Sequence, residues 1–315
     1  MKELLLGEAI KRRRLELGLT QEQLCEGLCD PATLCRLENN RQTPAHNRIK
    51  ALLQRLNMPD DRYYALLSPH ELELASVRKE FVACHSRFAR AEPEQKKQLW
   101  KLAMEQLHRL EGLAEDDDAI TRQFILNHRV ILGTPDGPYS FEERWAMLLE
   151  ALRLTVPKFD LERIEGRRYS VDETRLISQI AVTYSREGKH TKALEIYSQL
   201  FDYVRKNDDH LSNFAPHFTL IAYNYARELA LCARYQSAIE IAEQGRRVSV
   251  DYGHYQFFPG FLAAMGECYY QLGEEEKSKK LCVQAHYIYE ALGDERNLAL
   301  IDPDIKSRFQ IEFPV

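Results

Sequence analysis

The amino-terminal part of the chain contains the stretch that decides its fold, residues 7–44, GEAIKRRRLELGLTQEQLCEGLCDPATLCRLENNRQTP. Leucine and isoleucine recur in this stretch at helical spacing, and Gly18 ends the first helical segment. Thr20 is a suitable N-cap for a second helix, and Asp30 followed by Pro31 is a suitable start for a third. The spacing therefore predicts three short helices joined by tight turns.

The predicted second and third helices form a helix-turn-helix within an amino-terminal domain, residues 1–67, which we call the head. The head has eleven Lys/Arg against nine Asp/Glu, whereas residues 68–315 have 32 against 39. A mildly basic head on an acidic body suits a DNA-binding module joined to a region that avoids the phosphate backbone. The sequence thus indicates a DNA-binding head.

The stretch 7–44 resembles the xenobiotic-response-element-type helix-turn-helix family, whose pattern is roughly I-K-x-x-R-x-x-x-G-L-T-Q-x-x-L, then a recognition helix of small residues and R-x-E-N-G. Two positions depart from this pattern: Asn40 stands where glycine is usual, and Cys35 stands where serine is common. The resemblance implies that Arg14 and Glu38 form an ion pair between helices. It also implies that the third helix enters the major groove of DNA.

Seven positions of the head match residues that contact DNA in that family. The resemblance implies DNA contacts for Gln21, Ala32, Thr33, Arg36, Asn39, Arg41 and Thr43, the last three of them to phosphate. Arg36 is the candidate for reading guanine, because its planar guanidinium matches O6 and N7. The alternative is a small helical bundle for protein contact, in which Arg36 and Arg41 are ordinary solvated charges.

The composition excludes several classes of protein. Glycine (14) and proline (12) are scarce, which argues against a β-sandwich or barrel and favours an all-α chain. No apolar run approaches the ~18 residues of a spanning helix, and the amino end lacks the apolar stretch of a signal peptide, so we expect a cytoplasmic protein without membrane contact. Seven cysteines without paired spacing indicate reduced thiols, so we expect no metal site and no cofactor.

The remaining chain, residues 68–315, reads as helical hairpins. Helices are expected over 70–91 and up to about 113, and Asp116–Asp118 should cap the next. Three later segments share a pattern of small residues: 180–197, IAVTYSREGKHTKALEIY; 225–242, YARELALCARYQSAIEIA; and 265–282, MGECYYQLGEEEKSKKLC. This pattern resembles tetratricopeptide repeats with lengthened spacing, in which paired helices stack into an α-solenoid with a concave wall.

The first helix of each pair lines such a wall, and such walls bind peptides. Amide side chains there can hold an extended backbone, and arginines can hold a carboxylate. Polar and aromatic positions that do not pack between helices are the candidates for peptide binding: Asn127, Arg175, Gln179, Tyr223, Asn224, Arg227, Glu267 and Tyr270.

A helix-turn-helix head followed by such an array resembles the peptide-pheromone receptor regulators of Gram-positive bacteria, the Rgg, NprR, PlcR and PrgX group known as the RRNPP family. The resemblance implies a quorum-sensing transcription regulator that is a homodimer on a palindromic operator in double-stranded DNA. It also implies that a short signalling peptide binds the repeats, residues 68–315.

Two other functions are alternatives to this one. In the first, the protein is a DNA-bound adaptor whose repeats dock a protein partner instead of a free peptide. The second is catalysis, and the sequence speaks against it. Its ten histidines pair with no nucleophile or metal spacing, and it has no phosphate-binding glycine loop. We therefore expect no enzyme.

Overall fold

The computed structural model describes residues 6–58, 69–91, 93–134, 136–207 and 214–310. Within these ranges the chain forms fifteen α-helices and one short 3-10 helix, η1 (Ile164–Gly166), and its one β-type pairing is an isolated bridge between Thr134 and Gly137. The expected all-α class is confirmed. None of the described helices is both long and apolar enough to cross a membrane.

The chain divides into two compact units, one made of residues 1–183 with 206–212 and the other of 184–205 with 213–315. The boundary that the sequence predicts between 67 and 68 lies outside the described residues and stays a prediction. The first unit contains the head together with the helices that follow it.

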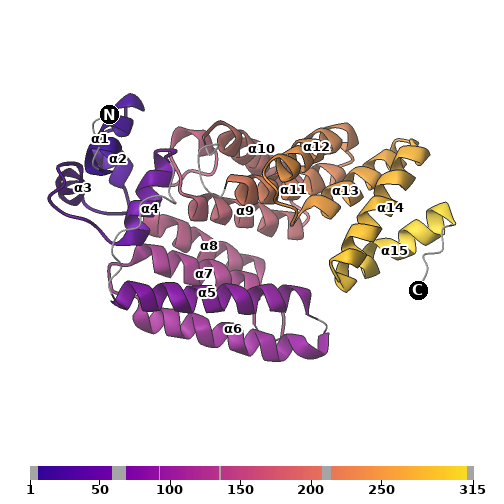
Figure 1. Cartoon of the computed structure of the whole chain (residues 1–315), viewed down its shortest axis with the longest axis horizontal. Coiled ribbons are helices and arrows are strands. Elements are labelled where there is room, and N and C mark those ends of the chain that lie inside the picture. The colour runs from indigo at the N-terminus through magenta and orange to yellow at the C-terminus, as the bar shows by residue number, and fades with distance from the viewer. Residues whose placement is uncertain (1–5, 59–68, 92, 135, 208–213, 311–315) are drawn as a thin grey trace. The chain divides into compact units, whose positions relative to one another are not determined.

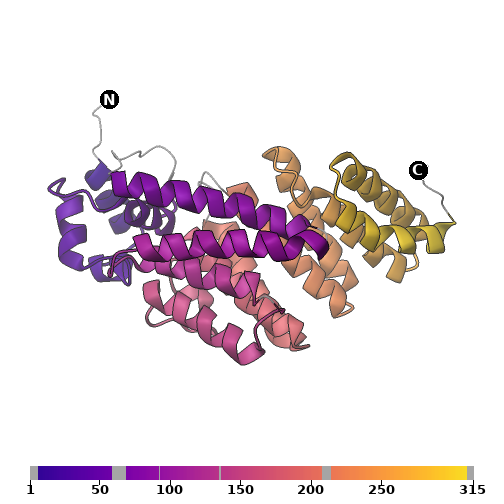
Figure 2. The same ribbon diagram turned by 90° about the horizontal axis from the view of Figure 1, so that it is seen from below.

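The helices of the first unit form a head and two hairpins. The α5–α6 and α7–α8 pairs lie side by side along the chain, and α6 also packs on α7 (Figures 1 and 2). In order, the elements are α1 (Leu6–Glu16), α2 (Gln21–Cys25), α3 (Pro31–Glu38), α4 (His46–Arg55), α5 (Pro69–Arg90), α6 (Pro93–Leu113), α7 (Ala119–Leu132), α8 (Phe141–Thr155) and most of α9 (Val171–Arg186). The expected break near Pro93 is found, because α5 ends at Arg90 and α6 begins at Pro93. The expected acidic cap of the next helix is also found, because Asp118 Oδ1 accepts a hydrogen bond from the Thr121 amide at 3.0 Å.

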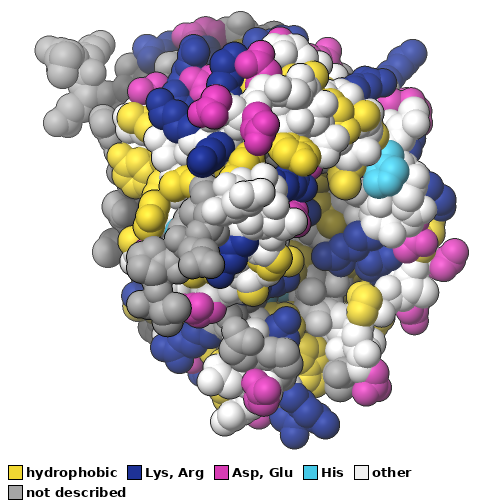
Figure 3. Space-filling view, turned by 90° about the vertical axis from the view of Figure 1, so that its right-hand side faces the viewer, with side chains coloured by type: hydrophobic (Ala, Val, Ile, Leu, Met, Phe, Trp, Pro, Cys, Tyr) yellow, Lys and Arg dark blue, Asp and Glu magenta, His cyan; other side chains and the backbone are white. Residues whose placement is uncertain are grey.

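The second unit continues the array of hairpins. Its elements are α10 (His190–Asn207), α11 (Phe214–Leu231), α12 (Tyr235–Asp251), α13 (Phe258–Gln271), α14 (Glu275–Ala291) and α15 (Glu295–Phe309). Helices α11 to α15 each pack on the next along the chain (Figure 1). The face at the α14–α15 end has acidic and basic side chains mixed with hydrophobic ones (Figure 3).

Small residues sit where the repeat pattern requires helices to approach closely. The predicted positions Ala181, Ala193, Ala226, Ala238, Gly266 and Ser278 are all buried. At Gly266, an added Cβ would lie 2.5 Å from the Cys282 Sγ. These positions confirm the tetratricopeptide-like packing.

The turns between paired helices repeat one backbone arrangement. After the first helix, Gly188, Ala233 and Gly273 adopt φ values of 71°, 56° and 79°, the left-handed conformation that ends a helix. The amide that follows each of them donates to a carbonyl five residues earlier, as Arg234 does to Leu229 at 2.9 Å. Gly293, with φ of 62°, repeats the arrangement between α14 and α15.

A cluster of aromatic rings and histidines fills the space between α5 and α7. The His128 ring lies 4.8 Å from the Phe81 ring and 4.0 Å from the Phe124 ring, centroid to centroid. Its Nδ1 lies 2.8 Å from the Phe124 carbonyl oxygen, so this nitrogen holds the proton and donates. Burial lowers the pKa of His128 to about 3.

This histidine makes the first unit sensitive to acid. An unfolded histidine has a pKa of about 6.5, so below that pH the unfolded chain takes up a proton that the folded chain does not. The stabilising contribution is therefore complete above that pH and is lost as the pH falls. From pH 7 to pH 5 we expect wild type to lose on the order of 1 kcal/mol more unfolding free energy than His128→Asn, since the ring is only half-buried. Urea denaturation at the two pH values measures this difference.

The exposed His108 on α6 provides the matched control. His108→Asn should keep the acid sensitivity of wild type. Equal sensitivity in wild type and His128→Asn would show that other groups cause it.

Candidate nucleic-acid interface

Both ends of α3, the predicted recognition helix, are fixed by local contacts. Asp30 Oδ1 accepts from the Thr33 amide at 2.9 Å, and Asp30 Oδ2 accepts from the Thr33 hydroxyl at 2.6 Å. Leu34 and Leu37 on the inner face are 0% and 3% exposed, and Asn40 ends the segment with φ of 56°. The predicted cap at Asp30 is confirmed, and the outer face of α3 is left to solvent.

A buried ion pair holds α3 against α1. Arg14 Nε lies 2.6 Å from Glu38 Oε1 and Arg14 Nη2 lies 2.9 Å from Glu38 Oε2, a two-pronged contact that confirms the expected pair. Gln21 Nε2 donates to the same carboxylate at 2.8 Å, which leaves its second N–H for another acceptor. The backbones meet at Gly7, where an added Cβ would lie 2.0 Å from the Leu37 carbonyl oxygen.

The residues expected at DNA lie on or beside this outer face. Those exposed to solvent are Ala32, Arg36, Asn39, Arg41 and Thr43, while Gln21 and Thr33 are half-buried. Arg36 Nη2 makes one weak contact to the Thr33 hydroxyl at 3.4 Å, and Asn39 Nδ2 donates to the Cys35 carbonyl at 2.7 Å. Arg36 thus has a guanidinium that faces solvent from the middle of an anchored helix, although its role at DNA stays a prediction.

Arg55, the last residue of α4, joins the head to the helices that follow it. Its Nη1 donates to the carbonyl oxygens of Leu24 at 3.0 Å and Glu26 at 2.7 Å, at the end of α2. Its Nη2 donates to the Thr155 carbonyl at 2.9 Å and to Glu173 Oε1 at 2.7 Å. The side chains of Arg55 and Glu173 are 3% and 0% exposed, so this is a fully buried ion pair.

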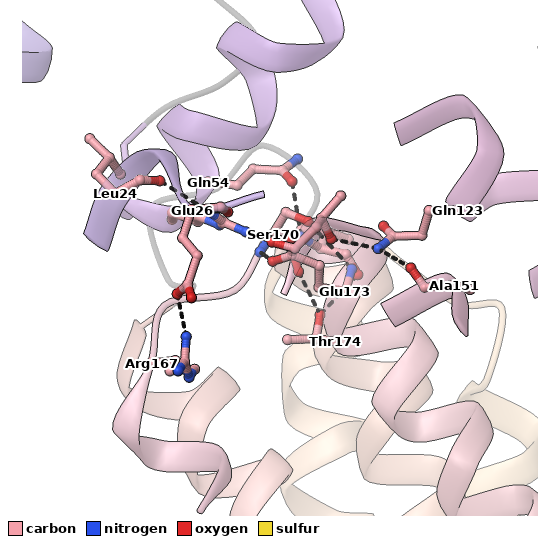
Figure 4. Close-up of polar contacts among 12 residues, drawn as sticks. Leu24, Glu26, Gln54, Gln123, Ala151, Arg167, Ser170, Glu173 and Thr174 are labelled. Atoms are coloured by element: carbon pink, nitrogen blue, oxygen red, sulfur yellow. Dashed lines mark hydrogen bonds and ion pairs between the residues drawn. The ribbon is translucent and has the colours of Figure 1, made fainter. Parts of the chain in front are cut away.

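The partner of Arg55 is itself fixed at the start of α9. Glu173 Oε2 accepts from the Ser170 amide at 2.6 Å, and the Ser170 hydroxyl accepts from the Glu173 amide at 3.3 Å. Beside them, Gln54 Oε1 accepts from the Val171 amide at 2.9 Å. Figure 4 shows these groups converging from α4 and α9. The head is therefore held on the first unit through both side chains and backbone.

Close backbone approach and surface contacts complete this junction. Gly27 has φ of 72°, and an added Cβ there would lie 2.1 Å from the Thr155 carbonyl oxygen. Arg48 Nη2 lies 2.7 Å from Asp117 Oδ2, and the hydrogen bond from Arg48 lowers the pKa of that carboxyl. Ile120 of α7 packs into the hydrophobic core of the head. The hydrophobic core of the head thus includes a side chain from the helices that follow it in the first unit.

The residues predicted to bind peptide lie on the first helix of each pair, namely Asn127 on α7, Arg175 and Gln179 on α9, Tyr223, Asn224 and Arg227 on α11, and Glu267 and Tyr270 on α13. In the first unit Asn127 is buried, and the Arg175 guanidinium lies 3.5 Å from Asp172, which Arg78 also contacts at 2.7 Å. Gln179 is half-buried.

The second-unit candidates have partners from their own chain. Tyr223 stacks on Phe257 at 5.2 Å between ring centroids, and the Arg227 guanidinium lies 5.6 Å above the Tyr223 ring. Arg308 of α15, which sequence reasoning missed, pairs with Glu267 and lies 4.3 Å above the Tyr270 ring. No local sequence signal identifies Arg308. The peptide-binding role of these residues stays a prediction.

Comparisons with known proteins place this arrangement in a family. A helix-turn-helix model matches residues 10–62, and the model of the RNPP family C-terminal domain matches residues 150–300. The chain belongs to the RNPP family. Family members are DNA-binding transcription regulators and not enzymes, and this RNPP protein is accordingly a regulator.

Solved structures of RNPP proteins share the fold of this chain. PlcR of Bacillus thuringiensis in complex with the peptide PapR7 and DNA superposes with a TM-score of 0.60 at 18% identity, over 94% of this chain and 98% of that one. Apo PlcR of the same organism gives 0.54 at 16% identity, over 95% and 98% of the two chains. Apo ComR of S. thermophilus gives 0.54 at 12% identity, over 94% and 97%. No curated protein matches the chain by sequence.

The buried ion pair of the junction can be tested by removing either partner. Arg55→Met leaves Glu173 buried without its cation, and Glu173→Gln leaves Arg55 buried without its anion. Each should lower the unfolding free energy by about 3 to 5 kcal/mol. Urea denaturation of the full chain measures the loss.

Arg109→Ala is the matched control, because Arg109 and Glu80 form an ion pair at 3.0 Å in which both side chains are 50% exposed. This change should cost no more than about 1 kcal/mol. If Arg109→Ala lowered the unfolding free energy as much as Arg55→Met or Glu173→Gln does, the larger stabilising role of the buried pair would be contradicted.

Proposed function

We propose that this RNPP protein is a quorum-sensing-type transcription regulator that binds operator DNA through α3 and a short signalling peptide through its helical repeats. As a homodimer it would present two heads to the half-sites of a palindromic operator. Half-sites of such operators lie about one helical turn apart, and each head alone makes few contacts. The domain assignment within this proposal is 1–67 for DNA and 68–315 for peptide and dimerisation.

One observation supports the DNA-binding part above all others. The outer face of α3 is open to solvent, and Arg36 lies in the middle of it, while Asp30, Glu38 and the inner leucines hold the helix on the head. A rigid helix with an exposed guanidinium suits the major groove, where arginine reads guanine with two hydrogen bonds. PlcR, which shares the fold, has been solved in complex with DNA and a peptide.

Arg36→Ala tests the reading of a base. The operator is first selected from random duplexes with the wild-type chain, and then each base pair is varied in a binding titration. Arg36→Ala should cost about 1 to 3 kcal/mol on the selected operator and relax the preference at one base pair. Weakening by the same factor on every duplex would reassign Arg36 to phosphate.

Arg41→Ala is the matched control, since Arg41 is exposed beside α3 and is expected at phosphate. It should weaken binding to all duplexes about equally and lower the slope of log K against log salt by about 1. If the base preference changed in Arg41→Ala and not in Arg36→Ala, Arg41 would be the residue that reads the base and Arg36 the one that contacts phosphate.

The peptide-binding part is tested by titrating short synthetic peptides encoded near this gene into the full chain. A peptide that binds the folded state should raise the melting temperature and change operator affinity, because the two ligands are linked. Asn224→Ala should reduce both effects while operator affinity without peptide stays unchanged. Undiminished response in Asn224→Ala would place the peptide elsewhere.

A protein-docking adaptor is the second candidate function. Its repeats would bind a folded partner instead of a free peptide, as stacked helical repeats also do. It is favoured if no peptide in the set changes either melting temperature or operator affinity.

A further inference from the structure

Three side chains with different donor atoms meet in the second unit. His190 is the first residue of α10, Glu228 lies in the last turn of α11, and Cys232 follows α11 directly. The imidazole, carboxylate and thiol donor atoms all lie within 4.8 Å of one another. Among the described residues, this is the cluster in which three such donors come together.

The backbone fixes the relative positions of the three residues. Glu228 and Cys232 are four residues apart, and the Cys232 amide donates to the Glu228 carbonyl at 3.1 Å, so their side chains share one face at the end of α11. His190 arrives from the start of α10, where its Nδ1 lies 2.7 Å from Glu228 Oε1. The cluster therefore links two helices that belong to successive hairpins.

The dimensions are close to those of a tetrahedral metal site. Zinc lies about 2.0 to 2.2 Å from nitrogen or oxygen and about 2.3 Å from sulfur, which puts neighbouring ligand atoms roughly 3.3 to 3.6 Å apart. The His190–Glu228 separation of 2.7 Å lies below that range, and all three separations are within 4.8 Å. A bound ion would therefore require the His190–Glu228 contact to open by less than about 1 Å.

The surroundings favour a cation at this position. The Glu228 side chain is only 4% exposed, and a buried carboxylate requires a positive partner or strong hydrogen bonds. The His190 side chain is 38% exposed, so solvent and ions reach the cluster from that side. Three protein ligands with one open side is the arrangement in which a water completes the coordination.

We propose that His190, Glu228 and Cys232 bind a transition-metal dication of the zinc class, with water as the fourth ligand. Imidazole and thiolate donors select such ions over Mg²⁺ and Ca²⁺, which take oxygen ligands. Binding releases the Cys232 proton to solvent and replaces the His190–Glu228 hydrogen bond by two metal–ligand bonds. The proton on His190 Nδ1 goes to solvent if the ring is an imidazolium, and a neutral ring changes tautomer so that Nε2 carries it. The bound ion would join α10 to α11 and so fix the angle between these two helices of the second unit.

The full chain, stripped of metal with a chelator, is titrated with Co²⁺ in the presence of excess Mg²⁺. Tetrahedral cobalt with one thiolate gives visible ligand-field bands and a sulfur-to-cobalt charge-transfer band in the near ultraviolet. We expect these bands to saturate at one equivalent, to be bleached by Zn²⁺, and to be accompanied by a higher melting temperature.

Cys232→Ser, which is nearly isosteric, should abolish the charge-transfer band, and His190→Ala should weaken metal binding at least tenfold. Cys84→Ser is the matched control, because Cys84 on α5 is also half-buried, and it should behave as wild type. Circular dichroism of the metal-free variants checks that each is folded. The proposal is overturned if wild type binds no stoichiometric cobalt, or if the band survives in Cys232→Ser. The cluster would then be an ordinary histidine–carboxylate contact beside a free thiol.

Discussion

The ion pair between Arg55 and Glu173 is the contact on which the first unit depends. Both groups are removed from water, and a buried charge is tolerated only when hydrogen bonds and an opposite charge replace hydration. Arg55 meets this requirement with two carbonyl oxygens at the end of α2, one at the end of α8, and the carboxylate. Those α2 carbonyls would otherwise lack partners at a helix end. The Arg55 side chain thus binds the end of α2 within the head and attaches the head to α8 and α9.

This attachment limits how the head can move. Any rearrangement that separates α4 from α9 leaves two charges buried without partners, which costs several kcal/mol. A ligand can produce such a rearrangement only if it favours the rearranged state by at least that amount. Within the proposed function, a motion of the whole first unit that keeps this pair intact avoids that cost.

Helix caps, helix breaks and turns were predicted correctly from the sequence, because they depend on residues that are close together along the chain. The start of α2 is an example, since Thr20 and Gln23 cap each other through hydrogen bonds of 2.8 and 3.1 Å. The cap of α3, the break near Pro93 and the left-handed turns after each first helix of a repeat follow from the same short-range chemistry. The Arg14–Glu38 pair was reached through resemblance to a family and not through spacing.

Contacts between distant parts of the chain were not predictable in this way. Arg55 and Glu173 are 118 residues apart, and nothing in either local sequence indicates the other. His190 and Glu228 are 38 residues apart, so their meeting with Cys232 escapes any search for metal-ligand spacing. Asn127 is buried, which its residue type and helix did not indicate, because periodicity alone does not distinguish the two sides of a helix packed on both.

Gly27 determines which changes this junction can accept during evolution. The crowding there is between main-chain atoms of the head and the Thr155 carbonyl, so trimming a nearby side chain cannot make room for a methyl group. A residue with a Cβ at this position would require the end of α8 to move away from the head. A head transplanted from this chain should therefore fit only where the end of α8 leaves the same clearance for the main chain at Gly27.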